Sequence, residues 1–119
     1  MTTKIRLNNI QFYGWHGIGN KEKEIGQQFE IDVEVIVSID SDIDSDDIFK
    51  TANYSDIYDN IVHIFSEKKY NLIETLANNI SISILQKFDV TACTVRIRKP
   101  NVPINGILDS VEVEVSNNV

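Results

Sequence analysis

Residues 28–39 contain the most regular pattern in the chain, an alternation of apolar and polar side chains. One face carries only apolar residues, namely Phe29, Ile31, Val33, Val35, Val37 and Ile39. The other face is polar except at Ile36. A period of two with one polar face is typical of a half-buried strand in an antiparallel sheet. The pattern therefore requires a second layer that covers the apolar face.

Three further segments have strand patterns, namely residues 4–13, 90–99 and 108–115. In the first of them the alternation slips by one position at Asn8-Asn9. Such a slip predicts a β-bulge, which re-aims the side chains that follow it. We expect residues 4–13 and 28–39 to pair as a long hairpin.

Residues 54–67 and 72–88 have the period of amphipathic helices. Asn53 or Ser55 can cap the first of these helices, and Asn71 is a good N-cap residue for the second. The element order is strand, strand, helix, helix, strand, strand. This order predicts one α+β domain over residues 1–119, in which both helices cover one face of a four-stranded antiparallel sheet.

The charge and composition exclude several classes of partner. The net charge of −7 argues against nucleic acid and anionic membranes, because phosphate groups require clustered lysine and arginine. No apolar run approaches the roughly 20 residues of a membrane helix, and no secretory signal is visible. The single cysteine, Cys93, fits a reducing compartment. We therefore expect a cytoplasmic protein.

Metal sites receive little support from the sequence. Residues 40–47 are rich in aspartate, but the EF-hand pattern fails because Ser45 and Thr51 occupy the positions of its glycine and closing glutamate. A solvated loop is the better interpretation. The two histidines, His16 and His63, form no H-x-H pair, and no second cysteine exists. We expect neither a metal nor a cofactor.

The segment 12–26 contains four of the five glycines, the aromatic pair Tyr13 and Trp15, and the carboxylates of Glu22 and Glu24. Glycines at this density allow tight turns and close backbone approach. A simple hairpin connection needs only about two to five residues. The segment is therefore either a functional loop or a wide loop with a solvated charge cluster.

The same segment reads F-Y-G-W-H-G-x-x-x-x-E-x-E-I-G and resembles the opening signature of the dihydroneopterin aldolases, enzymes of folate biosynthesis. Three later motifs agree in order and spacing, namely Asn53-Tyr54, N-L-I-E-T-L-A over 71–77 and R-I-R-K-P over 96–100. The resemblance covers nearly the whole chain. It implies a tunnelling fold, in which sheets of several subunits join edge to edge into a barrel. It also implies a homo-oligomer, a tetramer or an octamer, with active sites between subunits.

Lys99 ends an otherwise apolar row of the strand 90–99. The pattern leaves two interpretations, a strand-end lysine that reaches water and a proton-exchanging group at the mouth of an apolar pocket. Glu22 alone reads as a surface charge in a mixed cluster. The resemblance implies that Lys99 is catalytic and that Glu22 works with it.

Glu74 lies three residues after Asn71, which is a capping-box spacing. The pattern by itself favours this structural role. The resemblance implies instead that Glu74 anchors a pterin, whose exocyclic amine and ring N–H can both bind one carboxylate. Asn71, Leu72 and Ile73 would then line the pterin pocket.

Tyr54 begins the first long helix, where an aromatic residue often only packs. The resemblance implies that its hydroxyl is catalytic and reaches an active site on a neighbouring subunit. Ala52 and Asn53 beside it would offer backbone groups to the ligand.

The reaction that the resemblance implies is a metal-independent retro-aldol cleavage of 7,8-dihydroneopterin. Two alternatives stay open. One is an epimerase acting on dihydroneopterin or its triphosphate, for which Lys21, Lys23 and Arg98 would supply positive charge. The other is a non-catalytic pterin-binding oligomer.

Overall fold

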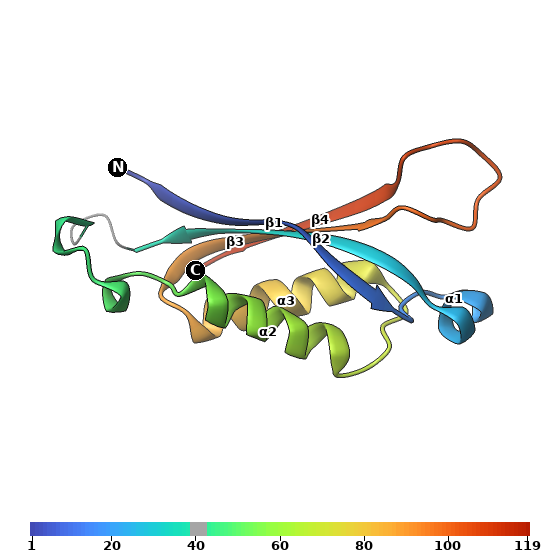
Figure 1. The fold of residues 1–119 in the computed structure, drawn as a ribbon, viewed down its shortest axis with the longest axis horizontal. Coiled ribbons are helices and arrows are strands. Elements are labelled where there is room, and N and C mark those ends of the chain that lie inside the picture. Colours follow the sequence, from blue (N-terminus) through green and yellow to red (C-terminus); the bar gives the residue numbers. More distant parts are fainter. Residues whose placement is uncertain (39–42) are drawn as a thin grey trace.

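The computed structural model describes residues 1–38 and 43–119, and it has two layers (Figure 1). One layer is a four-stranded antiparallel sheet in the order β1-β2-β3-β4. Its strands are β1 (Thr3–Gly14), β2 (Gln27–Val37), β3 (Val90–Lys99) and β4 (Val111–Asn118). The other layer consists of the helices α2 (Tyr54–Ser66) and α3 (Ile73–Lys87). The predicted α+β fold is confirmed.

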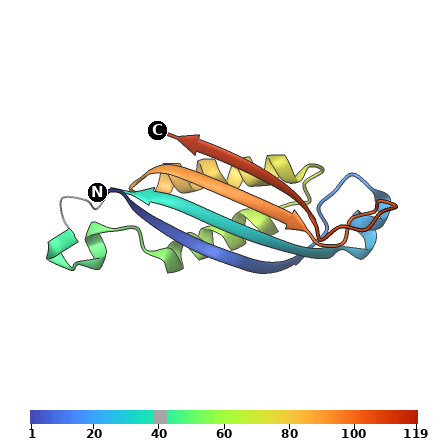
Figure 2. The same ribbon diagram turned by 90° about the horizontal axis from the view of Figure 1, so that it is seen from above.

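Both long helices lie on the same face of the sheet, with α2 beside β1 and α3 beneath β3 and β4 (Figure 2). The alternation in β2 produces this arrangement, because every second residue from Phe29 to Val37 is apolar and almost completely buried. They pack against fully buried helix residues, which include Ile57, Ile61, Leu76, Ile80 and Ile84. The opposite face of the sheet is polar and carries ion pairs.

The β-bulge predicted at Asn8-Asn9 is confirmed. The register between β1 and β2 shifts between Leu7 and Ile10, and Asn9 has a positive φ of 55°. The Asn9 backbone N–H donates to Asp32 Oδ1 at 2.7 Å, and Arg98 donates to the Asn9 side chain at 3.2 Å. Beyond the bulge, the Phe12 side chain stacks on Phe65 of α2, with 4.5 Å between ring centroids.

Two predictions about element limits are wrong. The glycine-rich segment is not only a loop, because it contains a short helix, α1 (Asn20–Ile25). The last strand begins at Val111 instead of residue 108 and continues to Asn118. Its limits follow from pairing, since Val111 lies opposite Lys99 and Asn118 lies opposite Ala92.

The helix caps also differ from expectation in one case. Of the two candidates for α2, Asn53 and not Ser55 is the cap, and the Asn53 Oδ1 accepts from the Ser55 N–H at 2.9 Å. Asn71 does not cap α3, because Leu72 occupies the N-cap position without a side-chain hydrogen bond. The Asn71 side chain instead binds Lys23 in α1, with Lys23 Nζ donating to Asn71 Oδ1 at 2.6 Å. A tertiary contact thus replaces the local one.

The aspartate-rich segment is described in part. Residues 40–42, and Ile39 at the predicted end of the second strand, lie outside the described residues. The rest forms two 3-10 turns, η1 (Ile43–Ser45) and η2 (Ile48–Lys50), and Asp47 caps the second turn through the Phe49 N–H at 3.0 Å. In the described part of the chain, no helix is both long and apolar enough to cross a membrane.

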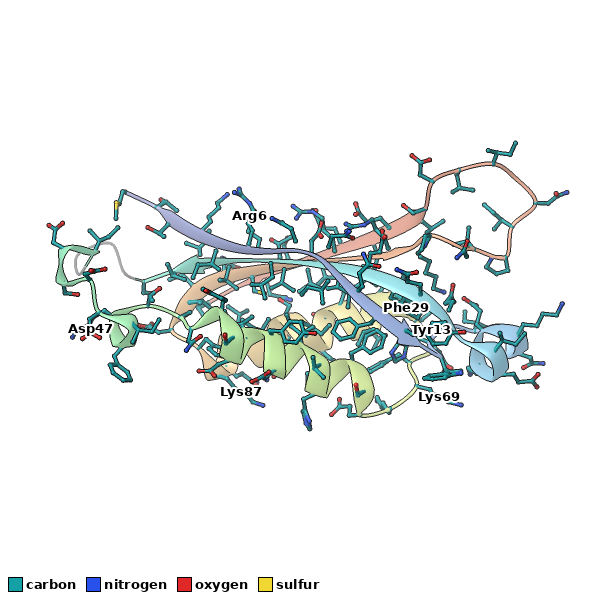
Figure 3. The ribbon with its side chains drawn as sticks, viewed as in Figure 1. Arg6, Tyr13, Phe29, Asp47, Lys69 and Lys87 are labelled. Carbon is teal, nitrogen blue, oxygen red and sulfur yellow. The ribbon has the colours of Figure 1, made fainter. Side chains whose placement is uncertain are left out.

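The molecule is elongated, with extents of 52 × 28 × 22 Å. Helix α1 lies at one end, where α3 begins, and α2 begins toward the opposite end (Figure 1). In Figure 3, Tyr13 and Lys69 lie near α1, whereas Asp47 and Lys87 lie toward the other end. The two ends carry different parts of the predicted site.

Candidate active site

Lys99 and Glu22 form a partly buried ion pair at the α1 end of the sheet. Lys99 is the last residue of β3, and its Nζ donates to Glu22 Oε2 at 2.7 Å. Each side chain is only 13% exposed. A pair so shielded from water interacts more strongly than a surface pair, because solvent screens it less. The structure thus joins the two residues that the resemblance had placed together.

The glycines of the segment allow Glu22 to lie in this position. Gly19 precedes α1, and its backbone N–H donates to Glu22 Oε1 at 3.3 Å. Gly17 has a φ of +139°, and a Cβ at this residue would lie 2.5 Å from the Glu22 carboxyl carbon. Only glycine leaves that space open and adopts that backbone conformation without strain. The loop backbone therefore packs closely against the Glu22 carboxylate.

Gln27, the first residue of β2, is a third member of this cluster that the sequence analysis missed. Its Nε2 donates to Glu22 Oε2 at 2.6 Å, and the residue is 8% exposed. A signal for it exists in the sequence. Gln27 lies two residues before Phe29, so it continues the apolar row of the strand with a polar side chain.

The charge of Glu22 is stabilised by its neighbours. Burial alone would raise the pKa of Glu22, but hydrogen bonds from Lys99 and Gln27, together with the positive charge of Lys99, outweigh it and lower the pKa. Glu22 is therefore an anion at neutral pH. A carboxylate held in this way can orient the lysine and accept hydrogen bonds from a ligand.

His16 anchors the glycine-rich segment to the connection between α2 and α3. It is 2% exposed, and its Nδ1 accepts from the Tyr70 backbone N–H at 2.9 Å. The Gly17 N–H donates in return to the Tyr70 carbonyl at 2.8 Å. Burial lowers the pKa of His16, the backbone of Phe65 opposes this shift, and the charge of Lys99 reinforces it. His63 is exposed, as expected from its place in the helix.

The start of α3 lies against α1. The contact between Lys23 and Asn71 brings the predicted pterin-binding residues at the start of α3 to the same end as Glu22. Ile73 is buried and Leu72 is 43% exposed. Glu74 is exposed, and in the described residues its carboxylate has no hydrogen bond or ion pair. The capping-box interpretation of Glu74 is therefore wrong, and its carboxylate is available to a ligand.

A shallow pocket of about 260 Å³ opens beside the Lys99–Glu22 pair. It is lined by Lys21, Glu22, Ile25, Gly26, Gln27, Asn101, Val102 and Pro103. The pocket lies between α1 and the turn that follows β3. It gives a small molecule access to the Glu22 side of the pair.

Tyr54, Ala52 and Asn53 lie toward the other end of the molecule, at the start of α2 (Figure 1). The Tyr54 side chain is 63% exposed, and Ala52 is buried. Ala52 and Asn53 line a separate pocket of about 470 Å³ with Phe49 and Phe88. One subunit therefore does not bring these three residues together with Lys99 and Glu22. Among the residues that the structure describes, no group of three His, Cys, Asp or Glu side chains is arranged to hold a metal ion.

An antiparallel four-stranded sheet with two helices on one face, and with a lysine–carboxylate pair at one end, defines a tunnelling-fold enzyme subunit. The family model of dihydroneopterin aldolase (FolB) matches residues 5–116, and the chain belongs to this family.

Relatives of known name agree with this assignment. The chain is 37% identical over 116 residues to a dihydroneopterin aldolase of Staphylococcus epidermidis, covering 97% of this chain and 96% of that protein. It is 34% identical over 114 residues to that of Bacillus subtilis, covering 95% of each. The solved E. coli dihydroneopterin aldolase, in complex with neopterin, has a TM-score of 0.86 at 19% identity and covers 98% of this chain and 99% of that one. This last likeness shows the shared fold.

Proposed function

We propose that the protein cleaves 7,8-dihydroneopterin by a retro-aldol reaction to 6-hydroxymethyl-7,8-dihydropterin and glycolaldehyde, as a cytoplasmic enzyme of folate biosynthesis. The single domain, residues 1–119, carries the activity. The observation that supports it most is the shielded Lys99–Glu22 pair, at 2.7 Å, in a member of the dihydroneopterin aldolase family. The complex of the E. coli relative with neopterin supports a pterin ligand.

The chemistry requires proton transfer and no metal. The dihydropterin ring has a C=N bond next to its side chain, and this bond accepts the electron pair when the carbon–carbon bond breaks. The hydroxyl on the second side-chain carbon loses its proton as the bond between the first and second side-chain carbons breaks, and a proton is added to the ring nitrogen. The first carbon then takes up a proton while the ring nitrogen loses one, which restores the C=N bond and gives the hydroxymethyl product. No Schiff base to the lysine is needed. The demands on the protein are thus an acid–base group near the ring and an anchor for the pterin.

We assign the proton at the ring nitrogen to Lys99, whose Nζ is held by Glu22. Glu22 orients Lys99 and a water molecule. The Tyr54 hydroxyl moves the proton at the side-chain hydroxyl or at the cleaved carbon. Each such group typically contributes about 10²–10⁴ in rate.

Pterin binding is assigned to the start of α3. The Glu74 carboxylate accepts hydrogen bonds from the exocyclic amine and the adjacent ring N–H of the pterin. Asn71, Leu72 and Ile73 line the same pocket, and Ala52 and Asn53 of a neighbouring subunit contribute backbone groups. The exposure of Glu74 and its lack of a partner among the described residues support this role.

The complete site forms between subunits of a homo-oligomer, a tetramer or an octamer. Tyr54 lies toward the opposite end of a 52 Å molecule from α1, so a second copy must supply it. The sheet is open at β1 and β4, and such edges are normally paired or protected. Joining subunits at these edges would close the barrel of the tunnelling fold.

Turnover of 7,8-dihydroneopterin by the purified protein in EDTA tests the function. Chromatography should show 6-hydroxymethyl-7,8-dihydropterin, and Lys99→Ala should lower kcat by about 10²–10⁴ while pterin still binds. Lys4→Ala, on the polar face of the sheet, is the matched control. Pterin binding without any turnover by the wild type would contradict the proposal and leave a binding protein.

Epimerisation is a second activity of the same site. Re-addition of glycolaldehyde to the opposite face inverts the side-chain hydroxyl, and Lys21 beside Glu22 supplies positive charge for a phosphorylated substrate. The same chromatograms should show a minor epimer. If the epimer is the sole product, epimerase is the main activity.

Mixed oligomers test the shared site. Lys99→Ala and Tyr54→Phe are each expected to be weakly active, but after joint refolding about one quarter of the sites would combine an intact lysine with an intact tyrosine. Recovery toward this level supports a site between subunits. Activity that stays at the average of the two variants would show that each chain uses its own tyrosine.

A further inference from the structure

Gln27 is an exception on the buried face of β2. This face carries apolar side chains from Phe29 to Val37, and Gln27 precedes them in the same row at 8% exposure. Packing alone would favour an apolar side chain of the same length here, because a buried amide must be compensated by hydrogen bonds. The contacts of the amide should therefore explain its presence.

The amide nitrogen makes one short contact. Gln27 Nε2 lies 2.6 Å from Glu22 Oε2 and 3.5 Å from the His16 carbonyl oxygen. A carboxylate has no hydrogen to donate, so the nitrogen and not the oxygen of the amide must face Glu22. Glu22 Oε2 thus accepts from both Gln27 and Lys99.

The amide oxygen has no such compensation. Gln27 Oε1 is buried and has no hydrogen-bond partner in the described part of the chain. A buried acceptor without a partner is unfavourable, and such groups call for an explanation in function or strain. Among the described residues, only the nitrogen of the amide therefore has hydrogen-bond partners, and its short hydrogen bond is to Glu22.

We propose that Gln27 is a positioning residue, which holds the Glu22 carboxylate against Lys99 in the orientation needed for proton transfer. The inference rests on the proposed roles of Lys99 and Glu22. It follows from the way α1 is attached, because none of its residues is fully buried in the core. Polar contacts therefore fix Glu22, and Gln27 supplies one from the rigid sheet.

The neutral amide has a further consequence for the site. It stabilises the Glu22 anion, and lowers the pKa of that carboxyl, without adding a positive charge. Among the described residues, Lys99 is the cation within ion-pair distance of Glu22. The carboxylate can then be shared between Lys99 and Gln27 without competition from a second cation.

The variant Gln27→Met tests the inference, because methionine keeps the length and burial of the side chain and removes the donor. A displacement of about 1 Å can cost 10²-fold in rate, so we expect kcat to fall roughly 10- to 100-fold. The KM should change less than about threefold, since the pterin anchor lies on α3. The acid limb of the pH profile should move to higher pH, because Glu22 loses a hydrogen bond.

Gln28→Met is the matched control. Gln28 is the next residue of β2, it is exposed on the opposite face, and it contacts Gln11. The same substitution there should leave kcat and the pH profile unchanged. Circular dichroism and thermal unfolding of both variants show whether the fold is kept.

Gln27→Glu is the second variant, and it tests the positioning role of Gln27 if Gln27→Met does not fold. Two carboxylates at this distance would share one proton, so activity should be low at neutral pH and recover in part as the pH falls. A folded Gln27→Glu with the wild-type profile would overturn the inference. So would a folded Gln27→Met with kcat within about threefold of wild type and an unmoved acid limb.

The two proposals fail differently. If the wild type does not cleave dihydroneopterin, or if Lys99→Ala keeps full activity, the proposed function fails and the inference fails with it. If both of those tests succeed while the Gln27 variants behave like wild type, only the positioning role is overturned.

Discussion

Gly17→Ala is expected to lower kcat strongly in a protein that still folds. Gly17 has a φ of +139°, and an added Cβ would lie 2.5 Å from the Glu22 carboxyl carbon. Ordinary contact begins at 3.4 Å, so the carboxyl group must retreat by about 0.9 Å, the difference of the two distances. This movement is larger than the difference between the 2.7 Å distance from Glu22 to Lys99 and the usual upper limit of a hydrogen bond, about 3.2 Å.

The two effects of the substitution have different sizes. The strained backbone should cost on the order of 1–3 kcal/mol of unfolding free energy. A misplacement of about 1 Å at a catalytic group can cost about 10²-fold in rate, which corresponds to about 2.7 kcal/mol of activation free energy. We therefore expect a folded variant with kcat lowered by about two orders of magnitude. Pterin binding should persist, because Glu74 lies on α3.

The assay compares kcat, pterin affinity and thermal unfolding for three glycine variants. Gly19 has a φ of −66°, and its added Cβ would lie 3.3 Å from Glu22 Oε1. An added Cβ at Gly106 has no atom within 4 Å. Gly19→Ala should thus have a small effect and Gly106→Ala none. A folded Gly17→Ala with wild-type kcat would refute the assignment of Glu22.

Three further results are expected. Because burial lowers the pKa of His16 in the folded protein, the unfolded chain binds the proton first, so the unfolding free energy should fall as the pH drops below about 6.5. Denaturant titrations should show a weaker pH dependence for His16→Asn in that range, and an unchanged slope would contradict the role of His16. Burial raises the pKa of the Cys93 thiol to about 11, so a thiol reagent at pH 8 should label Cys93 only after unfolding. Leu76 of α3 is fully buried in the hydrophobic core, and Leu76→Ala should cost about 2–5 kcal/mol in a denaturant titration, whereas a cost below about 1 kcal/mol would contradict its core position.

The fold was largely predictable because its signals are local. The alternation of β2, the helical stripes of α2 and α3, and the phase slip at Asn8-Asn9 are each visible in a few consecutive residues. Side-chain period alone distinguishes a strand from a helix, and a buried face requires a covering layer. The order of elements then leaves few ways to arrange two helices on a four-stranded sheet.

The candidate site was predictable only in part. Lys99, Glu22 and Glu74 were assigned through a resemblance, since the sequence pattern of each also fits a role without catalysis or binding, as a strand-end lysine, a surface charge or a helix cap. The capping interpretation of Asn71 and Glu74 failed because Lys23, which is distant in the sequence, takes the Asn71 side chain. A pattern of neighbouring residues does not show that a residue from another element will bind the same side chain.

The strands, the helices and the buried face of each can be predicted from the sequence, because they depend on periodicity. The contacts by which Gln27 and His16 hold the glycine-rich segment, and the separation of Tyr54 from Lys99 within one subunit, become visible in the folded structure. These features depend on contacts between residues that are distant in the chain, and hydrogen-bond geometry over a few ångströms exists only after the layers have packed.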